Sequence, residues 1–267
     1  ASAVWVRGLN SAVYMAPLLA LAGRKWVFDM RGLPAEEGVM LGRWKEESPF
    51  YRLLGLYQRW VLRSASQILV VSSVMADYVQ AIRGRDGTVS VVPNLMAAGA
   101  ADCTAVGAGD LPQPTPVRFV FSGGAQPWQS LEQVVGCWVA IDAVLHHGTE
   151  LTVLGGEKVK ERIQAVLPTT LDLRERVFLT SVHPSEMCQA LRSNHVGLAL
   201  RSDSVVNRVA SPGKVPEYLE AGLFVLMTDS VGDFSRELPE AGVGCVVRMP
   251  VSRREAQDIG QKIQAIV

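Results

Sequence analysis

Short apolar runs recur along the second part of the chain, from Arg118 onward, and segments with a helical pattern separate them. Most of these runs show no alternation of apolar and polar positions, which is typical of strands covered on both faces of a sheet. Most are followed by Gly, Ser or Pro and then by a helix-like segment. The pattern predicts a parallel, doubly wound α/β sheet. Its predicted strands are Arg118–Ser122, Leu151–Leu154, Val177–Thr180, Val196–Leu200, Phe224–Thr228 and Cys245–Arg248.

The first part of the chain repeats this alternation with fewer units. The predicted strands are Val4–Val6, Trp26–Asp29, Ile68–Val71 and Val89–Val92, and the predicted helices lie near Ala12–Ala22, Phe50–Arg63 and Val74–Ile82. Ser72 or Ser73 is expected to cap the last of these helices. The stretch from Ala97 to Pro116 is rich in Ala, Gly and Pro without periodicity, which is typical of a connector. We therefore expect two domains, residues 1–110 with a linker from about 97, and residues 117–267.

Composition narrows the class of protein. A chain of 267 residues that is 48% apolar buries a sizeable core, which excludes disordered chains and small disulfide scaffolds. Its 26 basic and 26 acidic residues give no net charge, so binding of nucleic acid is not expected. The apolar stretches are shorter than the roughly 20 residues that span a bilayer. The four cysteines show no C-x-x-C spacing, which favours buried thiols in a reducing, cytoplasmic compartment.

Ligands of a parallel sheet bind at the carboxyl ends of its strands, where glycine turns leave backbone N–H groups available. Three turns qualify. Ser122-Gly123-Gly124 is equally consistent with a phosphate loop and with a tight turn. For Gly155-Gly156 a tight turn is favoured, because the carboxylate of Glu157 follows and would repel a phosphate.

The third turn, Ser211-Pro212-Gly213-Lys214, carries more information. Pro216 has no N–H and restrains Val215, so a helix is expected to begin at about Lys214 to Pro216. A Lys at a helix N-terminus makes most sense beside an anion, since the helix dipole disfavours a cation there. The alternative, favoured by base rates alone, is a solvated Lys214 that pairs with Glu217 three residues on.

Residues Ser211 to Val225, read as SPGKVPEYLEAGLFV, resemble the donor-binding segment of GT-B glycosyltransferases of the group 1 type, glycosyltransferase family 4. Further segments resemble the same family in the same order. They are Phe28-Asp29-Met30-Arg31-Gly32 with Glu36 and Glu37, Ile68-Leu69-Val70-Val71-Ser72, Val91-Val92-Pro93-Asn94, and Phe121-Ser122-Gly123-Gly124. The resemblance extends over nearly the whole chain.

This resemblance implies two Rossmann-like domains with parallel sheets and transfer of a sugar from a nucleotide-sugar, with retention of configuration and without an obligatory metal or other cofactor. By the match, Lys214 holds the donor diphosphate and Glu217 the ribose hydroxyls, and these two are the expected catalytic residues. The match implies further donor-binding residues. Gly123 and Gly124 lie near the phosphates, and the nucleobase is framed by Thr180, Ser181, Val182 and His183. The helix that is expected to begin near Lys214 is preceded by Ser211, Pro212 and Gly213. These roles suit the residue types, because a carboxylate accepts hydrogen bonds from a diol and cations stabilise a departing diphosphate.

The chain departs from the family pattern in two places. Val209 stands where many members carry a second carboxylate, and Gln126, Trp128 and Gln129 follow the glycine loop where a basic residue is usual. Arg201 or Arg208 is therefore expected to supply a second cation. The usual opening strand, glycine loop and long helix are also missing, so the first domain is expected to be incomplete by about a hundred residues.

Several functions agree with this pattern. We favour a transferase that acts on a glycan or lipid-linked acceptor in polysaccharide or glycoconjugate synthesis; the alternatives are a non-catalytic donor-binding subunit of the same fold and a nucleotide-sugar epimerase. The first part of the chain mixes basic and apolar residues, which would suit peripheral contact with the inner membrane face. These residues are Arg43, Trp44, Lys45 and Arg52, Arg59, Trp60, Arg63. The favoured explanation is an amphipathic helix packed on the sheet.

Overall fold

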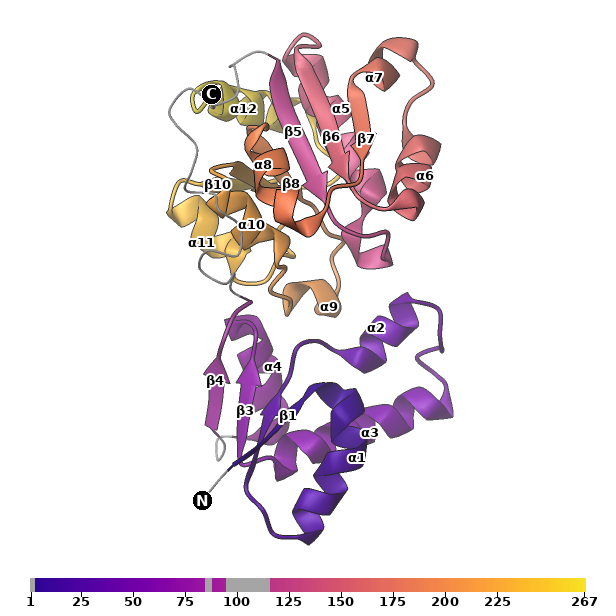
Figure 1. Ribbon diagram of the computed structural model, residues 1–267, viewed down its shortest axis with the longest axis vertical. Helices are drawn as coiled ribbons and strands as arrows, with labels where there is room; N and C mark the ends of the chain where they lie inside the picture. Colours follow the sequence, from indigo (N-terminus) through magenta and orange to yellow (C-terminus); the bar gives the residue numbers. More distant parts are fainter. Residues whose placement is uncertain (1–2, 85–87, 95–115) are drawn as a thin grey trace. The chain divides into compact units, whose positions relative to one another are not determined.

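The computed structural model describes residues 3–84, 88–94 and 116–267, and the chain forms two compact units (Figure 1). Unit 1 consists of Ala1–Asn94 together with Asp203–Ser211, and unit 2 consists of residues 95–202 and 212–267. All but one residue of the expected connector, residues 97–116, lies outside the described residues.

Unit 1 contains a parallel sheet of four strands in the order β1-β2-β3-β4. The strands are β1 (Val4–Arg7), β2 (Trp26–Asp29), β3 (Gln67–Val70) and β4 (Thr88–Val91). Each lies within one residue of its predicted bounds. Its helices are α1 (Gly8–Leu21), α2 (Pro34–Met40), α3 (Pro49–Ser64), α4 (Ser73–Arg83) and, from the later segment, α9 (Val205–Arg208).

The side chain of Ser72 caps α4 and also bonds to the later segment of unit 1. The hydroxyl oxygen of Ser72 accepts the N–H of Met75 at 3.0 Å, so the expected cap of α4 is present. The same hydroxyl donates to the carbonyl oxygen of Val209 at 2.7 Å, and the Val209 side chain is buried in the core of unit 1. These contacts explain why residues 203–211 pack with unit 1.

Unit 2 contains six parallel strands in the order β10-β9-β8-β5-β6-β7. This is the doubly wound order, in which the direction of winding reverses between β5 and β8. The strands are β5 (Val117–Ser122), β6 (Thr149–Leu154), β7 (Val177–Thr180), β8 (Val196–Ala199), β9 (Phe224–Met227) and β10 (Gly244–Val246). The helices are α5 (Leu131–Val144), α6 (Glu157–Val166), α7 (Leu171–Glu175), α8 (Met187–Arg192), α10 (Lys214–Glu220), α11 (Phe234–Glu240) and α12 (Arg253–Gln264).

The central strands of this sheet are buried on both faces, as their uninterrupted apolar runs predict. In β5, Phe119 and Phe121 lie in the core shared with α5 and α12, whereas Val120 lies in the core shared with α10 and α11. β9 divides in the same way, with Leu226 on the first face and Val225 on the second. A strand covered on both sides needs apolar residues at every position, which removes the alternation expected of a half-exposed strand.

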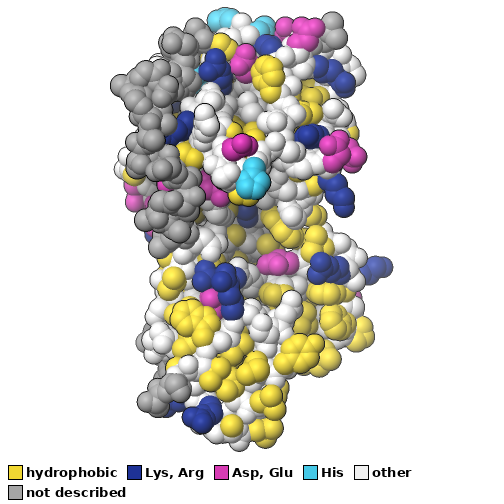
Figure 2. Space-filling view, viewed as in Figure 1, with side chains coloured by type: hydrophobic (Ala, Val, Ile, Leu, Met, Phe, Trp, Pro, Cys, Tyr) yellow, Lys and Arg dark blue, Asp and Glu magenta, His cyan; other side chains and the backbone are white. Residues whose placement is uncertain are grey.

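The helix α3 packs against the rest of unit 1 through the fully buried Val61 and Leu62, as its amphipathic pattern predicts. It also leaves Leu53 and Leu56 each 64% exposed. Figure 2 shows hydrophobic side chains gathered on the surface of this part of the chain. Over the part of the chain that the structure describes, no helix combines the length and the apolar character needed to cross a membrane.

The cysteines divide into two kinds. Cys137 and Cys245 are buried free thiols, as expected. Cys188 is disulfide-bonded, so the expectation of free thiols does not hold for it. Cys103 lies outside the described residues.

Replacement of Gly197 tests how α10 packs on β8. A Cβ atom at Gly197 would lie 2.4 Å from the ring of Tyr218, a fully buried residue of α10. We expect Gly197→Ala to lower the free energy of unfolding by about 1–3 kcal/mol, because the ring has no room to move away. Gly136→Ala is the matched control, since no atom lies within 4 Å of its Cβ position on the exposed side of α5. It should raise the free energy of unfolding by up to about 1 kcal/mol in urea denaturation; equal stability of the two variants would contradict this packing.

Candidate functional site

The candidate site lies in unit 2 at the carboxyl ends of β5 and β8, where the winding of the sheet reverses and ligands of such sheets bind. Ser122 ends β5 and leads into the glycine loop, and Arg201 follows closely after β8. The helix α10 begins at Lys214, within the range that Pro216 predicts.

Tyr218 holds α10 against these two strands. Its hydroxyl oxygen accepts two hydrogen bonds from Ser122, one from the backbone N–H at 2.8 Å and one from the side-chain hydroxyl at 3.2 Å. It also lies 3.4 Å from the carbonyl oxygen of Leu198 in β8. These three contacts place the first turn of α10 beside the glycine loop.

Lys214 is buried, with 8% of its surface exposed. Its Nζ donates a hydrogen bond to Oε1 of Gln129 at 2.8 Å and lies 3.9 Å from the centre of the Phe121 ring. Lys214 is therefore not the solvated lysine, paired with Glu217, that base rates alone favour. The φ angle of Gly123 is +149°, a conformation that favours glycine, and a Cβ atom there would lie only 3.1 Å from the same Nζ.

Positive charge is concentrated at this point of unit 2. Burial is the main cause that holds the pKa of Lys214 well below its usual value, the neighbouring Arg201 lowers it further, and Glu217 opposes the shift. Arg201 is itself buried, and burial lowers its pKa to about 10. Burial raises the pKa of the half-buried Glu217, Lys214 lowers it and Glu220 raises it. Two buried cations in one place attract an oxyanion, because an anion would offset the cost of removing them from water.

The segment after β7 lies at the same edge of the sheet. The carbonyl oxygen of Thr180 accepts the N–H of Gly155 at 3.0 Å, and the hydroxyl of Ser181 donates to the carbonyl oxygen of Gly155 at 2.8 Å. Val182 follows, and Nδ1 of the exposed His183 lies 2.7 Å from the hydroxyl oxygen of Ser185. Gly155 serves a tight turn, as favoured from the sequence, since a Cβ there would lie 2.8 Å from Val159.

The predicted residues divide between the two units. Gly123, Gly124, Arg201, Pro212, Gly213, Lys214, Glu217 and residues 180–183 lie in unit 2, and Ser211 lies in unit 1. The hydroxyl oxygen of Ser211 accepts the N–H of Asn94 at 3.2 Å. Of the two candidates for a second cation, Arg201 belongs to the unit of Lys214, whereas Arg208 belongs to unit 1 and forms an ion pair of 2.6 Å with Asp203.

Three residues of the site did not emerge as site residues from the sequence. In the sequence Gln129 is only a departure from the usual basic residue, yet it is the hydrogen-bond partner of Lys214. Tyr218 was part of the motif without a role. Thr228 fixes Arg201, because its Oγ1 accepts the Arg201 N–H at 3.0 Å and donates to the Arg201 carbonyl oxygen at 2.8 Å. In the described ranges, no three His, Cys, Asp or Glu side chains gather closely enough to hold a metal ion.

The pairing of Gln129 with Lys214 gives a prediction about charge. Gln129→Glu keeps the shape of the side chain and places a carboxylate against Nζ, so we expect the pKa of Lys214 to rise toward its usual value. Gln126→Glu, three residues earlier in the same loop and exposed, should change that pKa much less. Titration of the lysine ε-carbon by NMR measures both shifts. Equal effects of the two variants would show that Gln129 has no special contact with Lys214.

Comparison with known proteins relates the chain to one family and to several solved structures. Residues 1–95 match a family described as "Glycosyl transferase 4-like domain". Sucrose-phosphate synthase from Thermosynechococcus elongatus has a similar structure, with a TM-score of 0.64 and 14% sequence identity over 98% of this chain and 68% of that one. No curated protein sequence matches the chain.

Two further solved structures are similar to the chain. WaaG, a glycosyltransferase involved in lipopolysaccharide biosynthesis, has a TM-score of 0.61 and 14% identity, covering 96% of this chain and 73% of that one. HepE from Anabaena, in complex with UDP and glucose, has a TM-score of 0.62 and 14% identity, covering 98% and 67%. The predicted fold class, α/β of the GT-B type with two parallel sheets, is confirmed. The resemblance to group 1 GT-B glycosyltransferases and the expected enzyme class agree with the family match of residues 1–95, and the solved structures agree with the fold.

Proposed function

We propose that this GT-B protein is a retaining glycosyltransferase that moves a sugar from a nucleotide-sugar to a glycan or lipid-linked acceptor in polysaccharide or glycoconjugate synthesis. One observation carries the proposal: the buried Lys214 lies beside Gly123 at the point of the sheet where its winding reverses, and the buried Arg201 lies near enough to lower the pKa of Lys214. The match of residues 1–95 to a glycosyltransferase family supports it.

In this proposal the cations act on the leaving group. The bond between the anomeric carbon and the diphosphate oxygen breaks, and its electron pair passes to that oxygen. Lys214 and Arg201 stabilise the resulting negative charge. An acceptor hydroxyl forms the new bond to the anomeric carbon, and its proton passes to the departing diphosphate. Burial strengthens this interaction, because little water is present to screen it.

The neighbouring residues orient the donor. The carboxylate of Glu217 accepts hydrogen bonds from the two ribose hydroxyls, and the glycine loop allows the phosphates to approach the backbone closely. Residues 180–183 frame the nucleobase. HepE has the same fold and is described in complex with UDP and glucose, so UDP and UDP-glucose are the first compounds to test.

We extend the proposal to the setting of the reaction. The donor diphosphate is held by side-chain cations without an obligatory metal, and the protein acts in the cytoplasm. Peripheral contact with the inner membrane face occurs through α3, where Leu53 and Leu56 are exposed beside Arg52 and Arg59. Such contact would bring the enzyme to a lipid-linked acceptor.

Incubation with nucleotide-sugars in the presence of EDTA tests the activity and separates it from the alternatives. A transferase forms a glycoside when acceptors are supplied, an epimerase releases an epimer, and a donor-binding subunit shows saturable binding without either product. We expect the glycoside. An epimer as the product, or loss of donor binding on chelation, would contradict the proposal.

Two substitutions test the roles of Lys214 and Glu217. We expect Lys214→Ala to weaken binding of a nucleoside diphosphate about ten- to a hundredfold and binding of the nucleoside much less, because only the diphosphate meets the ammonium group. Glu217→Gln should weaken binding of both ligands, since both carry the ribose. Isothermal titration calorimetry measures the four affinities. Equal losses for both ligands in Lys214→Ala would remove the phosphate role from this residue.

A further inference from the structure

Glu220 carries a carboxylate that the fold does not stabilise. It is the last residue of α10, where the helix dipole disfavours a negative charge. Burial is the main cause that raises the pKa of Glu217, and the charge of Glu220, three residues further along α10, adds to it. Oε2 of Glu220 is buried and has no hydrogen-bond partner among the described residues. These features cost stability unless a bound molecule supplies a donor to this oxygen.

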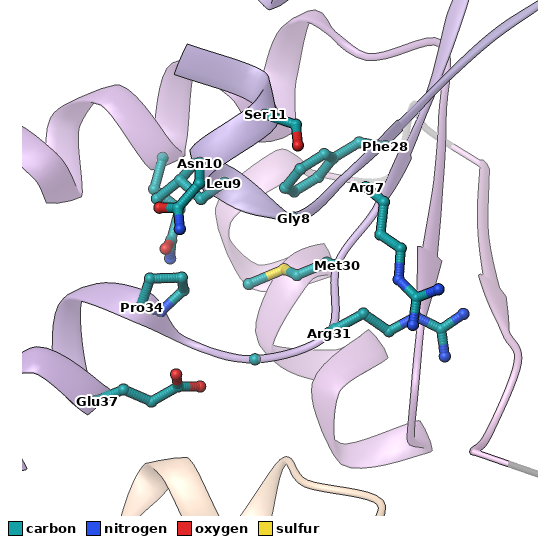
Figure 3. A pocket seen from close by; sticks show the side chains of 12 residues that line it. Arg7, Gly8, Leu9, Asn10, Ser11, Phe28, Met30, Arg31, Pro34 and Glu37 are labelled. Atoms are coloured by element: carbon teal, nitrogen blue, oxygen red, sulfur yellow. The ribbon is translucent and has the colours of Figure 1, made fainter. Parts of the chain in front are cut away.

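Glu37 in unit 1 shows the usual arrangement of a partly buried carboxylate. It lines a pocket of about 360 Å³ (Figure 3) and lies in the first turn of α2, where the helix dipole favours a negative charge. One of its oxygens accepts the N–H of Leu33 at 3.0 Å. Oε2 of Glu220 has neither the favourable helix end nor such a donor. The comparison indicates that this oxygen serves a ligand.

The helix α10 relates Glu220 to the parts of a nucleotide. Each residue of an α-helix advances about 1.5 Å along the axis, so Lys214, Glu217 and Glu220 follow one another at steps of about 4.5 Å. In the proposed function, on which this inference rests, Lys214 binds the diphosphate and Glu217 binds the ribose. The nucleobase is the next part of the donor in this direction.

The segment that frames the nucleobase in the proposed function lies on the same side of the sheet as α10. Val182 packs against the core cluster that contains Tyr218 of α10. The helix α8, which follows this segment, packs against α10 as well. A nucleobase framed by residues 180–183 would therefore lie within reach of the last turn of α10, which carries Glu220.

We propose that Glu220 reads the nucleobase of the donor and selects guanine, so that the donor is a guanosine diphosphate sugar. An ionised carboxylate has two acceptor oxygens and no donor. Guanine offers two adjacent donors, the ring N1–H and the exocyclic amino group, which form a pair of charge-assisted hydrogen bonds with a carboxylate. Uracil offers one N–H between two carbonyl oxygens, which a carboxylate repels. Adenine and cytosine carry a ring acceptor beside their amino group, so each offers one bond and one repulsion.

Calorimetric titration of the full chain with three nucleoside diphosphates tests the inference. GDP carries both donors, and inosine diphosphate lacks only the exocyclic amino group. UDP, the nucleotide described with HepE, lacks the pair of donors. We expect GDP to bind roughly tenfold more tightly than inosine diphosphate and roughly a hundredfold more tightly than UDP, since each missing donor leaves a carboxylate oxygen unpaired.

The variant Glu220→Gln locates the effect. The amide keeps the shape of the side chain but has only one acceptor oxygen, so the preference for GDP over inosine diphosphate should fall to roughly twofold or less. The Tm should not fall, because the change removes a charge from the unfavourable end of α10. Glu240→Gln, at an exposed position at the end of α11, is the matched control and should leave all three affinities unchanged.

Two results would overturn the inference: binding of UDP as tight as that of GDP, or an unchanged preference for GDP over inosine diphosphate in Glu220→Gln. Titration of Lys214→Ala with the same nucleotides keeps the two hypotheses apart. Binding of UDP that depends on Lys214, without a preference for GDP, would remove the inference and leave the proposed function. A preference for GDP that depends on Glu220 but not on Lys214 would do the reverse.

Discussion

The contact between the ring of Tyr218 and the backbone of Gly197 determines where the charges of unit 2 lie. Because Gly197 has no side chain, the ring rests on β8, and its hydroxyl reaches the backbone N–H of Ser122 at the end of β5. Lys214 precedes Tyr218 by four residues and thus lies on the same face of α10. The helix therefore directs Lys214 toward the glycine loop, where Gly123 leaves room for Nζ. Two glycines far apart in the chain together create the space for one buried ammonium group.

Unit 1 contains a hydrogen-bonded path that joins the end of β2 to Ser211. Arg31 binds Asp29, and its Nη1 donates to Oδ1 of Asn94 at 2.9 Å. The side-chain amide of Asn94 in turn donates to the carbonyl oxygen of Ser211 at 2.6 Å. Ser211 is the last residue of unit 1 before α10 begins at Lys214.

The sequence predicted the strands well because their signal is local: a run of apolar residues followed by a turn. It also predicted the start of α10, because a proline such as Pro216 restricts the backbone in any structural context. It did not predict that Lys214 is buried, because lysine is usually exposed and the cause of burial lies in distant glycines. Nor did it indicate that residues 203–211 pack with unit 1, since the hydrogen bond of Ser72 to Val209 joins residues 137 positions apart. The sequence does not predict α2, because a helix of seven residues is too short to show the helical period of apolar positions.

Two buried charges in unit 2 are held differently, and the difference supports the proposed role of Lys214 in binding a ligand. Asp142 is 1% exposed, and burial alone would raise its pKa, yet hydrogen bonds from Arg176, Thr149 and His147 outweigh that effect and lower it. This is how a structural charge is usually held, with opposite charge and several donors around it. The hydrogen-bond partner of Lys214 is the neutral amide of Gln129, and a second cation, Arg201, lies near enough to lower its pKa. A charge that the fold leaves without an opposite charge in contact costs stability, and such a cost is typical of sites that bind a charged molecule.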